Sequence, residues 1–145
     1  MSKVSASVNI NKPIAEVFAY AASAANGPAF IPNLNENTNI TPQEPGVGQT
    51  FDWRFNMGGV DLRGKAQVTE YDVPNRAKIV STGDTNSTWT YSFHEENDAT
   101  KVTLDVEYEL AENAAQKLAN KVVVEKLNQK SAEQSLGNLK TILEG

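Results

Sequence analysis

The C-terminal stretch from about Asn113 to Glu144 is the feature that most limits how this chain can fold. It contains no proline, and it predicts one long helix in which Asn113 is the N-cap and Gln116 completes a capping-box-like pair. At ~1.5 Å per residue such a helix is roughly 45 Å long, about the width of a small domain. The sequence before it predicts short strands, and their sheet needs a helix of this kind to cover one face.

One row of side chains along this helix is apolar in its C-terminal half and polar in its middle. The row follows alternating spacings of three and four, as one face of a helix does. It consists of Leu118, Val122, Glu125, Gln129, Ala132, Leu136, Leu139 and Leu143. A buried carboxylate without a partner is unfavourable, so two interpretations of Glu125 and Gln129 remain open. Either the middle of the helix spans the mouth of a wet groove, or these two side chains are polar groups of a ligand cavity.

The helix also carries an apolar cluster that its inward face does not explain. Val122-Val123-Val124, together with Leu127, makes this part of the helix apolar nearly all round. Such a pattern indicates a second contact, either with a loop of the same chain or with another subunit in a homodimer.

Length and composition are typical of an ordinary globular protein. With 39% hydrophobic and 21% charged residues, we expect residues 1–145 to form a single domain with its own core. The sequence has no cysteine, which excludes disulfides and zinc–cysteine sites. Its net charge of -5 and its scattered basic residues argue against a nucleic-acid partner. No apolar run approaches the ~20 residues of a membrane span and no signal peptide is evident, so we expect no membrane span and a cytoplasmic location.

Alternating apolar and polar residues predict an antiparallel sheet with one solvated face. The first strand covers residues 4–10, and two short helices follow, the second from about Ala22 to Phe30. Residues 33–48 are rich in Asn, Pro and Gly, which favours a loop around one short edge strand near residues 39–41.

The clearest hairpin joins residues 51–57 to residues 60–68. Gly58-Gly59 is expected to form its two-residue turn, because glycine tolerates the positive φ that such turns require. Further strands are predicted around residues 78–80, 88–93 and 101–110, so the sheet has about six to seven strands.

Five short segments carry a family likeness, in order along essentially the whole chain. They are Ile10–Phe18, Gly46–Phe51, Val68–Tyr71, Thr100–Thr103 and Ser135–Lys140. Together they resemble the SRPBCC or START-like superfamily, in its polyketide cyclase/dehydrase-like branch. These are fold motifs and not catalytic ones.

The resemblance implies an α+β helix-grip fold. In that fold a bent antiparallel sheet wraps around the long C-terminal helix, two short helices follow the first strand, and a cavity holds an apolar small molecule. Relatives commonly carry a tryptophan just before the Ile-Pro that follows the second helix, whereas this chain has Phe30 at that position. We therefore place Phe30 at the cavity rim, without an indole donor.

The candidate ligand site combines the aromatic side chains of inward parity with Phe30 and the middle of the long helix. Its members are Phe30, Phe51, Trp53, Phe55, Trp89, Tyr91, Phe93, Tyr108, Val122, Glu125 and Gln129. An apolar pocket with a few polar groups is what a small-molecule site needs, and Trp and Tyr bring polar atoms that require partners. The alternative is that these rings simply fill the core.

Candidate catalytic groups are few. His94 is the single histidine, and its position beside Glu95 and Glu96, opposite in parity to Trp89, favours the surface. Only carboxylates would remain as metal ligands, and their alternation directs them outward, so we predict no metal and no cofactor.

We expect a protein that binds a hydrophobic small molecule, such as a lipid, a quinone or a polyketide-like compound, and does not itself catalyse a reaction. Two other classes remain open. One is a polyketide cyclase or dehydratase in which Glu125 or Tyr91 acts as acid or base. The other is a module that presents residues 122–124 to a partner protein.

Overall fold

The computed structural model describes residues 2–110 and 121–145, without the side chains of residues 110 and 121–124. The elements are β1 (Ser2–Ile10), α1 (Ile14–Ala21), the 3₁₀ turn η1 (Ala24–Asn26), α2 (Gly27–Phe30), β2 (Leu34–Thr41), β3 (Thr50–Met57), β4 (Val60–Asp72), β5 (Arg76–Gly83), β6 (Thr85–Glu96), β7 (Ala99–Leu110) and α4 (Lys121–Glu144). The predicted helix cap at Asn113 and Gln116 lies outside the described residues, and so do the side chains of Val122 to Val124.

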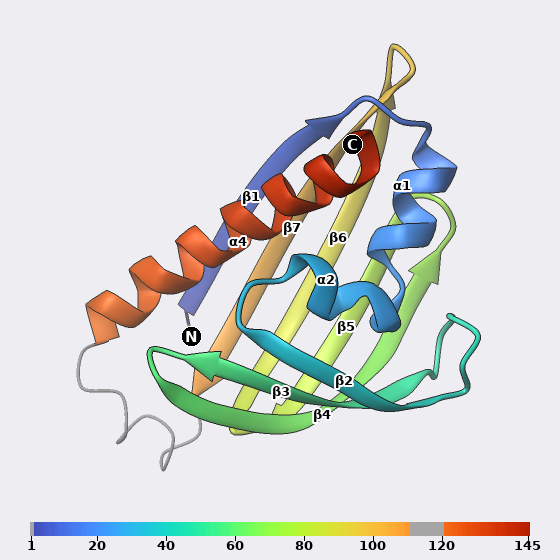
Figure 1. Ribbon diagram of the computed structural model, residues 1–145. Helices are drawn as coiled ribbons and strands as arrows, with labels where there is room; N and C mark the ends of the chain where they lie inside the picture. Colours follow the sequence, from blue (N-terminus) through green and yellow to red (C-terminus); the bar gives the residue numbers. More distant parts are fainter. Residues whose placement is uncertain (1, 111–120) are drawn as a thin grey trace.

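The seven strands form one sheet in the order β1-β7-β6-β5-β4-β3-β2, and every neighbouring pair is antiparallel. Figure 1 shows α1, α2 and α4 on one face of this sheet, with β2, β3 and β4 curving around beneath them. The long helix packs against β1, β7 and α2. The predicted helix-grip α+β fold is therefore confirmed, including the two short helices after the first strand.

The hairpin of β3 and β4 follows the alternation of its sequence. Phe51, Trp53 and Met57 are buried, and the turn glycines have φ of 59° at Gly58 and 89° at Gly59, as a primed turn requires. A side chain at Gly64 would stand 2.5 Å from the indole of Trp53, so glycine at this position lets the indole lie across β4.

The segment after α2 differs from expectation, because β2 begins at Leu34 and not near Asn39. It pairs only with β3, and the register shifts between Leu34 and Glu36 and again between Thr38 and Thr41. Asn39 itself has a φ of 53°. These irregularities interrupt the two-residue period, which is why the sequence pattern did not reveal the whole edge strand.

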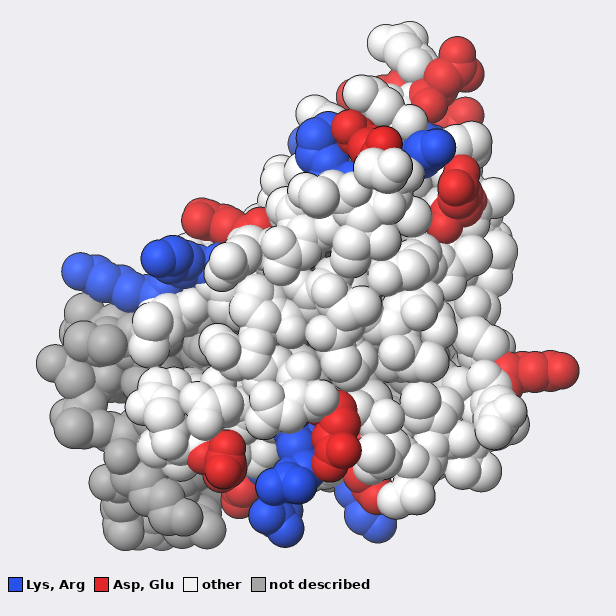
Figure 2. All heavy atoms as spheres, viewed as in Figure 1, with Lys and Arg blue, Asp and Glu red and all other residues white. Residues whose placement is uncertain are grey.

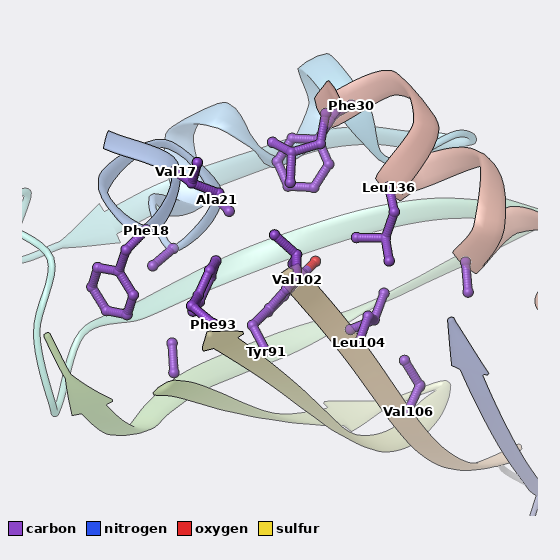
Figure 3. Packing of buried hydrophobic residues seen from close by; sticks show 14 of the residues in the cluster. Val17, Phe18, Ala21, Phe30, Tyr91, Phe93, Val102, Leu104, Val106 and Leu136 are labelled. Atoms are coloured by element: carbon purple, nitrogen blue, oxygen red, sulfur yellow. The ribbon is translucent and has the colours of Figure 1, made fainter. Parts of the chain in front are cut away.

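The C-terminal half of α4 supplies the helix side of the core. Four of its side chains are buried: Ala132, Ser135, Leu136 and Leu139. The burial of Ala132, Leu136 and Leu139 was predicted from the apolar half of the helical row. Figure 3 shows Leu136 and Phe30 on the helix side of the core, facing sheet residues such as Tyr91 and Leu104. The helix is also tied to α2, because Asn138 Nδ2 donates a hydrogen bond to the backbone oxygen of Phe30 at 3.0 Å.

Candidate ligand-binding site

A cavity of about 130 Å³ lies between the sheet, the η1–α2 segment and α4. Part of its floor is a row of directly opposed residues on four neighbouring strands: Ile79 faces Trp89, Trp89 faces Val106, and Val106 faces Val4. Ala132 of α4 contributes to the lining from the helix side. The cavity is therefore built where the helix leaves part of the apolar sheet face uncovered.

Two packed clusters meet at this cavity. One cluster includes Val4, Tyr91 and Ala132, and the other includes Phe51 and Trp53. All five of these residues line the cavity, and so does Ile79, which packs against both clusters.

Six of the predicted aromatic residues line the cavity. They are Phe51, Trp53, Phe55, Trp89, Tyr91 and Tyr108. Phe93 and Phe30 do not line it, although both are buried. Phe93 packs edge-on against Phe18 of α1, with ring centroids 5.1 Å apart, and Phe30 lies 6.1 Å from Tyr20. Their inward direction was foreseen, but both lie in the packed core and not in the cavity lining. Figure 3 shows Phe93 beside Phe18.

The inward placement predicted for Glu125 and Gln129 is wrong. Glu125 is exposed and accepts a hydrogen bond from Ser2 Oγ at 3.1 Å. Gln129 Nε2 donates to the backbone oxygen of Ser5 at 2.8 Å, and the backbone N–H of Ser5 donates to Gln129 Oε1 at 3.4 Å. The middle of α4 lies over the edge strand β1, so Gln129 meets backbone groups of Ser5 that have no strand neighbour on that side, and Glu125 meets the Ser2 hydroxyl.

The last turns of α4 close the same sheet edge. Lys140 Nζ donates to the backbone oxygen of Asn9 at 2.6 Å, and the backbone N–H of Asn11 donates to Glu144 Oε2 at 2.9 Å. Hydrogen bonds from Lys140, then from Asn11, hold the pKa of the Glu144 carboxyl below its usual range. Polar side chains of α4 thus make hydrogen bonds to the free edge of β1 that a neighbouring strand would otherwise make.

Both indoles at the cavity have hydrogen-bond partners within the protein. Trp53 Nε1 donates to the backbone oxygen of Lys65 at 3.2 Å, and Trp89 Nε1 donates to Ser87 Oγ at 3.1 Å. The tryptophans therefore have no unmet polar demand, and they contribute apolar surface to the lining.

Three other polar atoms of lining residues are buried and have no partner. They are the hydroxyl oxygens of Tyr91 and Tyr108 and the side-chain oxygen of Asn37. Burial also raises the pKa of the Tyr91 phenol, so this group is a neutral O–H donor. Figure 3 shows its oxygen directed from the sheet toward the side of α2 and α4.

The sequence reasoning did not identify most of the residues that line the cavity. The remaining ones are Val4, Ala22, Ser23, Ala24, Gly27, Ile31, Leu34, Asn37, Met57, Ile79, Ser81, Thr85, Ser87, Val106, Asn128, Ser131, Ala132 and Ser135. For Thr85 and Ser87 a signal was present, because they share the parity of Trp89 along β6. For residues of η1, α2 and β2 no periodic signal exists.

An outer hollow of about 340 Å³ lies between the β3–β4 turn and α4. It shares Phe55, Met57, Asn128 and Ser131 with the cavity lining, and Asn128 Nδ2 stands 4.0 Å from Met57 Sδ at this boundary. The outer hollow therefore adjoins the cavity beneath α4. Figure 2 shows charged side chains around the margin of the helix-covered face and an uncharged centre.

The lining that the structure describes contains no charged side chain. None of the described residues that line the cavity is acidic, basic or histidine. His94 is exposed, 3.8 Å from Glu96, which confirms its predicted surface position. In the described part of the chain, no helix has the length and apolar character needed to cross a membrane.

The sequence matches the family described as polyketide cyclase / dehydrase and lipid transport over residues 1–144. Comparison with curated proteins found no match. Among solved structures, the protein TTHA0849 from Thermus thermophilus superposes with a TM-score of 0.80 at 25% identity, covering 97% of this chain and 95% of that one.

Two more distant structures share the fold. A START superfamily protein from Mycobacterium smegmatis gives a TM-score of 0.75 at 15% identity, covering 98% of this chain and 97% of that one. The di-domain ARO/CYC protein BexL from the BE-7585A biosynthetic pathway gives 0.73 at 17% identity, and the match covers 99% of this chain and 50% of the di-domain.

Proposed function

The chain belongs to the polyketide cyclase/dehydrase and lipid transport family, of the SRPBCC or START-like type, and we propose that it binds a hydrophobic small molecule in the cavity beneath α4. In this proposal the protein holds its ligand without transforming it. The proposed ligand is a lipid, a quinone or a polyketide-like compound.

The cavity itself is the observation that supports this function. Empty apolar volume in an enclosed core costs ~24 cal/mol per Å³, so 130 Å³ left unfilled would cost at most about 3 kcal/mol in this partly open cavity. That is a large share of the ~5–15 kcal/mol that stabilises a typical domain. A bound apolar molecule would recover the lost contacts, which gives a physical reason for keeping the space.

Native mass spectrometry of protein purified from its own host tests the proposal directly, because a co-purifying molecule would reveal the ligand class. Titration calorimetry with toluene is the second test. We expect toluene to bind the wild type, and Ala132→Leu to abolish the heat of binding by filling the space beneath α4. Ala19→Leu makes the same change at an exposed position of α1 and should bind toluene normally. No co-purifying molecule and no toluene binding would refute the proposal.

A second candidate function is a cyclase or dehydratase, and one observation favours it. The Tyr91 phenol is buried and neutral at the cavity, so it could donate a proton to a bound carbonyl. Incubation of the purified protein with the recovered ligand distinguishes the two functions. A binding protein returns the ligand with its mass and chromatographic retention unchanged. A dehydratase yields a product lighter by one water, and a cyclase yields either that product or an isomer of the same mass with a different retention.

A further inference from the structure

The buried polar atoms at the cavity point to the kind of ligand that fits. Four side-chain N or O atoms of the described residues are buried without a partner, and three of them belong to lining residues: Asn37, Tyr91 and Tyr108. Because 90% or more of buried polar groups are paired in folded proteins, such a concentration at one cavity requires an explanation. We propose, on the basis of the proposed function, that the Asn37 oxygen and one of the two phenols recognise a neutral, single-ring ligand that carries a hydrogen-bond donor and an acceptor.

The orientation of the Asn37 amide decides what that residue can accept. Its Nδ2 donates to the backbone oxygen of Ala24 at 2.8 Å, and this fixes the nitrogen because the carbonyl can only accept. Gly27 makes the arrangement feasible, since a Cβ at that position would stand 2.8 Å from Asn37 Nδ2. The remaining amide oxygen is an acceptor only, so the ligand must bring an O–H or N–H group to it.

The two tyrosines call for the complementary group. Both are phenols whose O–H groups can donate, and burial keeps Tyr91 neutral. A ligand carbonyl or ether oxygen would accept such a hydrogen bond. Tyr91 stands opposite Leu104 while Tyr108 stands opposite Ser87, so the two are four residues apart along the sheet. That offset separates their Cα atoms by roughly 14 Å along the strands, so the two phenols lie toward different ends of the floor.

Size and charge narrow the ligand further. An engineered core cavity of about 150 Å³ in another protein takes up benzene, so 130 Å³ suits one substituted ring. A long acyl chain would have to extend through the outer hollow. None of the described lining residues carries a charge, and a buried ion without a partner is strongly disfavoured, which argues against a charged group inside the cavity.

Four compounds of similar shape separate these requirements in titration calorimetry. 4-Hydroxyacetophenone carries the donor and the acceptor, 4-methylacetophenone only the acceptor, 4-isopropylphenol only the donor, and 4-isopropyltoluene neither. We expect the first to bind most tightly and each removed group to weaken binding about fivefold, the value of one net hydrogen bond. Equal affinities for all four would overturn the inference and leave the proposed function standing. No binding of any, 4-isopropyltoluene included, would contradict the proposed function itself.

Conservative variants of the two tyrosines show which phenol donates a hydrogen bond to the ligand carbonyl. One of the two variants Tyr91→Phe and Tyr108→Phe should weaken 4-hydroxyacetophenone binding about fivefold, and both should leave 4-isopropylphenol binding unchanged, because the lost hydroxyl serves only the carbonyl. Tyr20→Phe, a half-buried tyrosine that does not line the cavity, is the matched control and should bind both compounds as the wild type does. If neither cavity variant changes the affinity for 4-hydroxyacetophenone, the phenols do not recognise the ligand and the inference is wrong.

Discussion

Replacing Tyr91 by phenylalanine should make the ligand-free protein more stable. The side chain is only 1% exposed and its hydroxyl has no hydrogen-bond partner. In most proteins the same substitution removes a hydrogen bond and is destabilising. Here it removes a group whose burial is itself unfavourable, so the sign of the effect should reverse.

The magnitude follows from the terms that change. A buried hydroxyl without a partner costs ~1–3 kcal/mol in mutational data. Removing its oxygen forfeits a few dispersion contacts of ~0.1–0.2 kcal/mol each, which offset only part of the gain. The net stabilisation should be about 1 kcal/mol, and for a chain of 145 residues this corresponds to a rise in Tm of roughly 3–5 °C.

Thermal unfolding followed by circular dichroism measures this difference, after removal of any co-purifying molecule. Tyr20→Phe is again the control and should change stability by no more than ~0.5 kcal/mol. Where Tyr91 is the phenol that holds the ligand carbonyl, saturation with 4-hydroxyacetophenone should bring Tyr91→Phe and the wild type to nearly equal stability, because fivefold tighter binding stabilises the wild type by about 1 kcal/mol more. A ligand-free Tyr91→Phe protein less stable than the wild type would refute the reasoning, since the hydroxyl would then have a partner in solution.

Three further substitutions test separate contacts. Gly27→Ala should displace the Asn37 amide and weaken 4-hydroxyacetophenone about fivefold in calorimetry; unchanged affinity would contradict the role of the amide. Gln129→Ala should lower the free energy of unfolding in urea by about 1 kcal/mol, through its bonds to Ser5, and leave toluene binding intact. Lost binding with full stability would instead return Gln129 to the cavity. Glu144→Gln should be less stable than the wild type at pH 7, and the two should converge as the pH falls below 4.5 through the lowered pKa of Glu144. A difference that persists in acid would show that the charge is not responsible.

The parts of this protein that could be predicted from its sequence are those set by the repeating pattern of apolar residues within one strand or helix. Alternation along residues 51–57 determined which side chains of β3 point inward, and Gly58-Gly59 determined the turn. Spacings of three and four identified Leu136 and Leu139 as core residues of α4. Each of these features depends on the direction of a side chain, which the backbone of a single strand or helix sets without reference to the rest of the chain.

The periodicity of a strand or helix predicts which side chains face inward, but not which of them reach the cavity. Tyr91 and Phe93 share one parity on β6, yet only Tyr91 lines the cavity, because α1 brings Phe18 against Phe93. Position also decides the role of Gln129 on α4. This residue belongs to the same helical row as Leu136, but at Gln129 the helix lies over the free edge of β1, and the side chain bonds to Ser5.

The sequence by itself determined most of the elements, the inward faces of β3 and of the C-terminal half of α4, and the family to which the chain belongs. Tertiary structure alone decided where α4 crosses the sheet, which polar groups find partners and where a space remains. The reason is that Asn37 comes from an irregular edge strand and Tyr91 and Tyr108 from two central strands, and their unpaired atoms meet one cavity only after the sheet has closed around the helix.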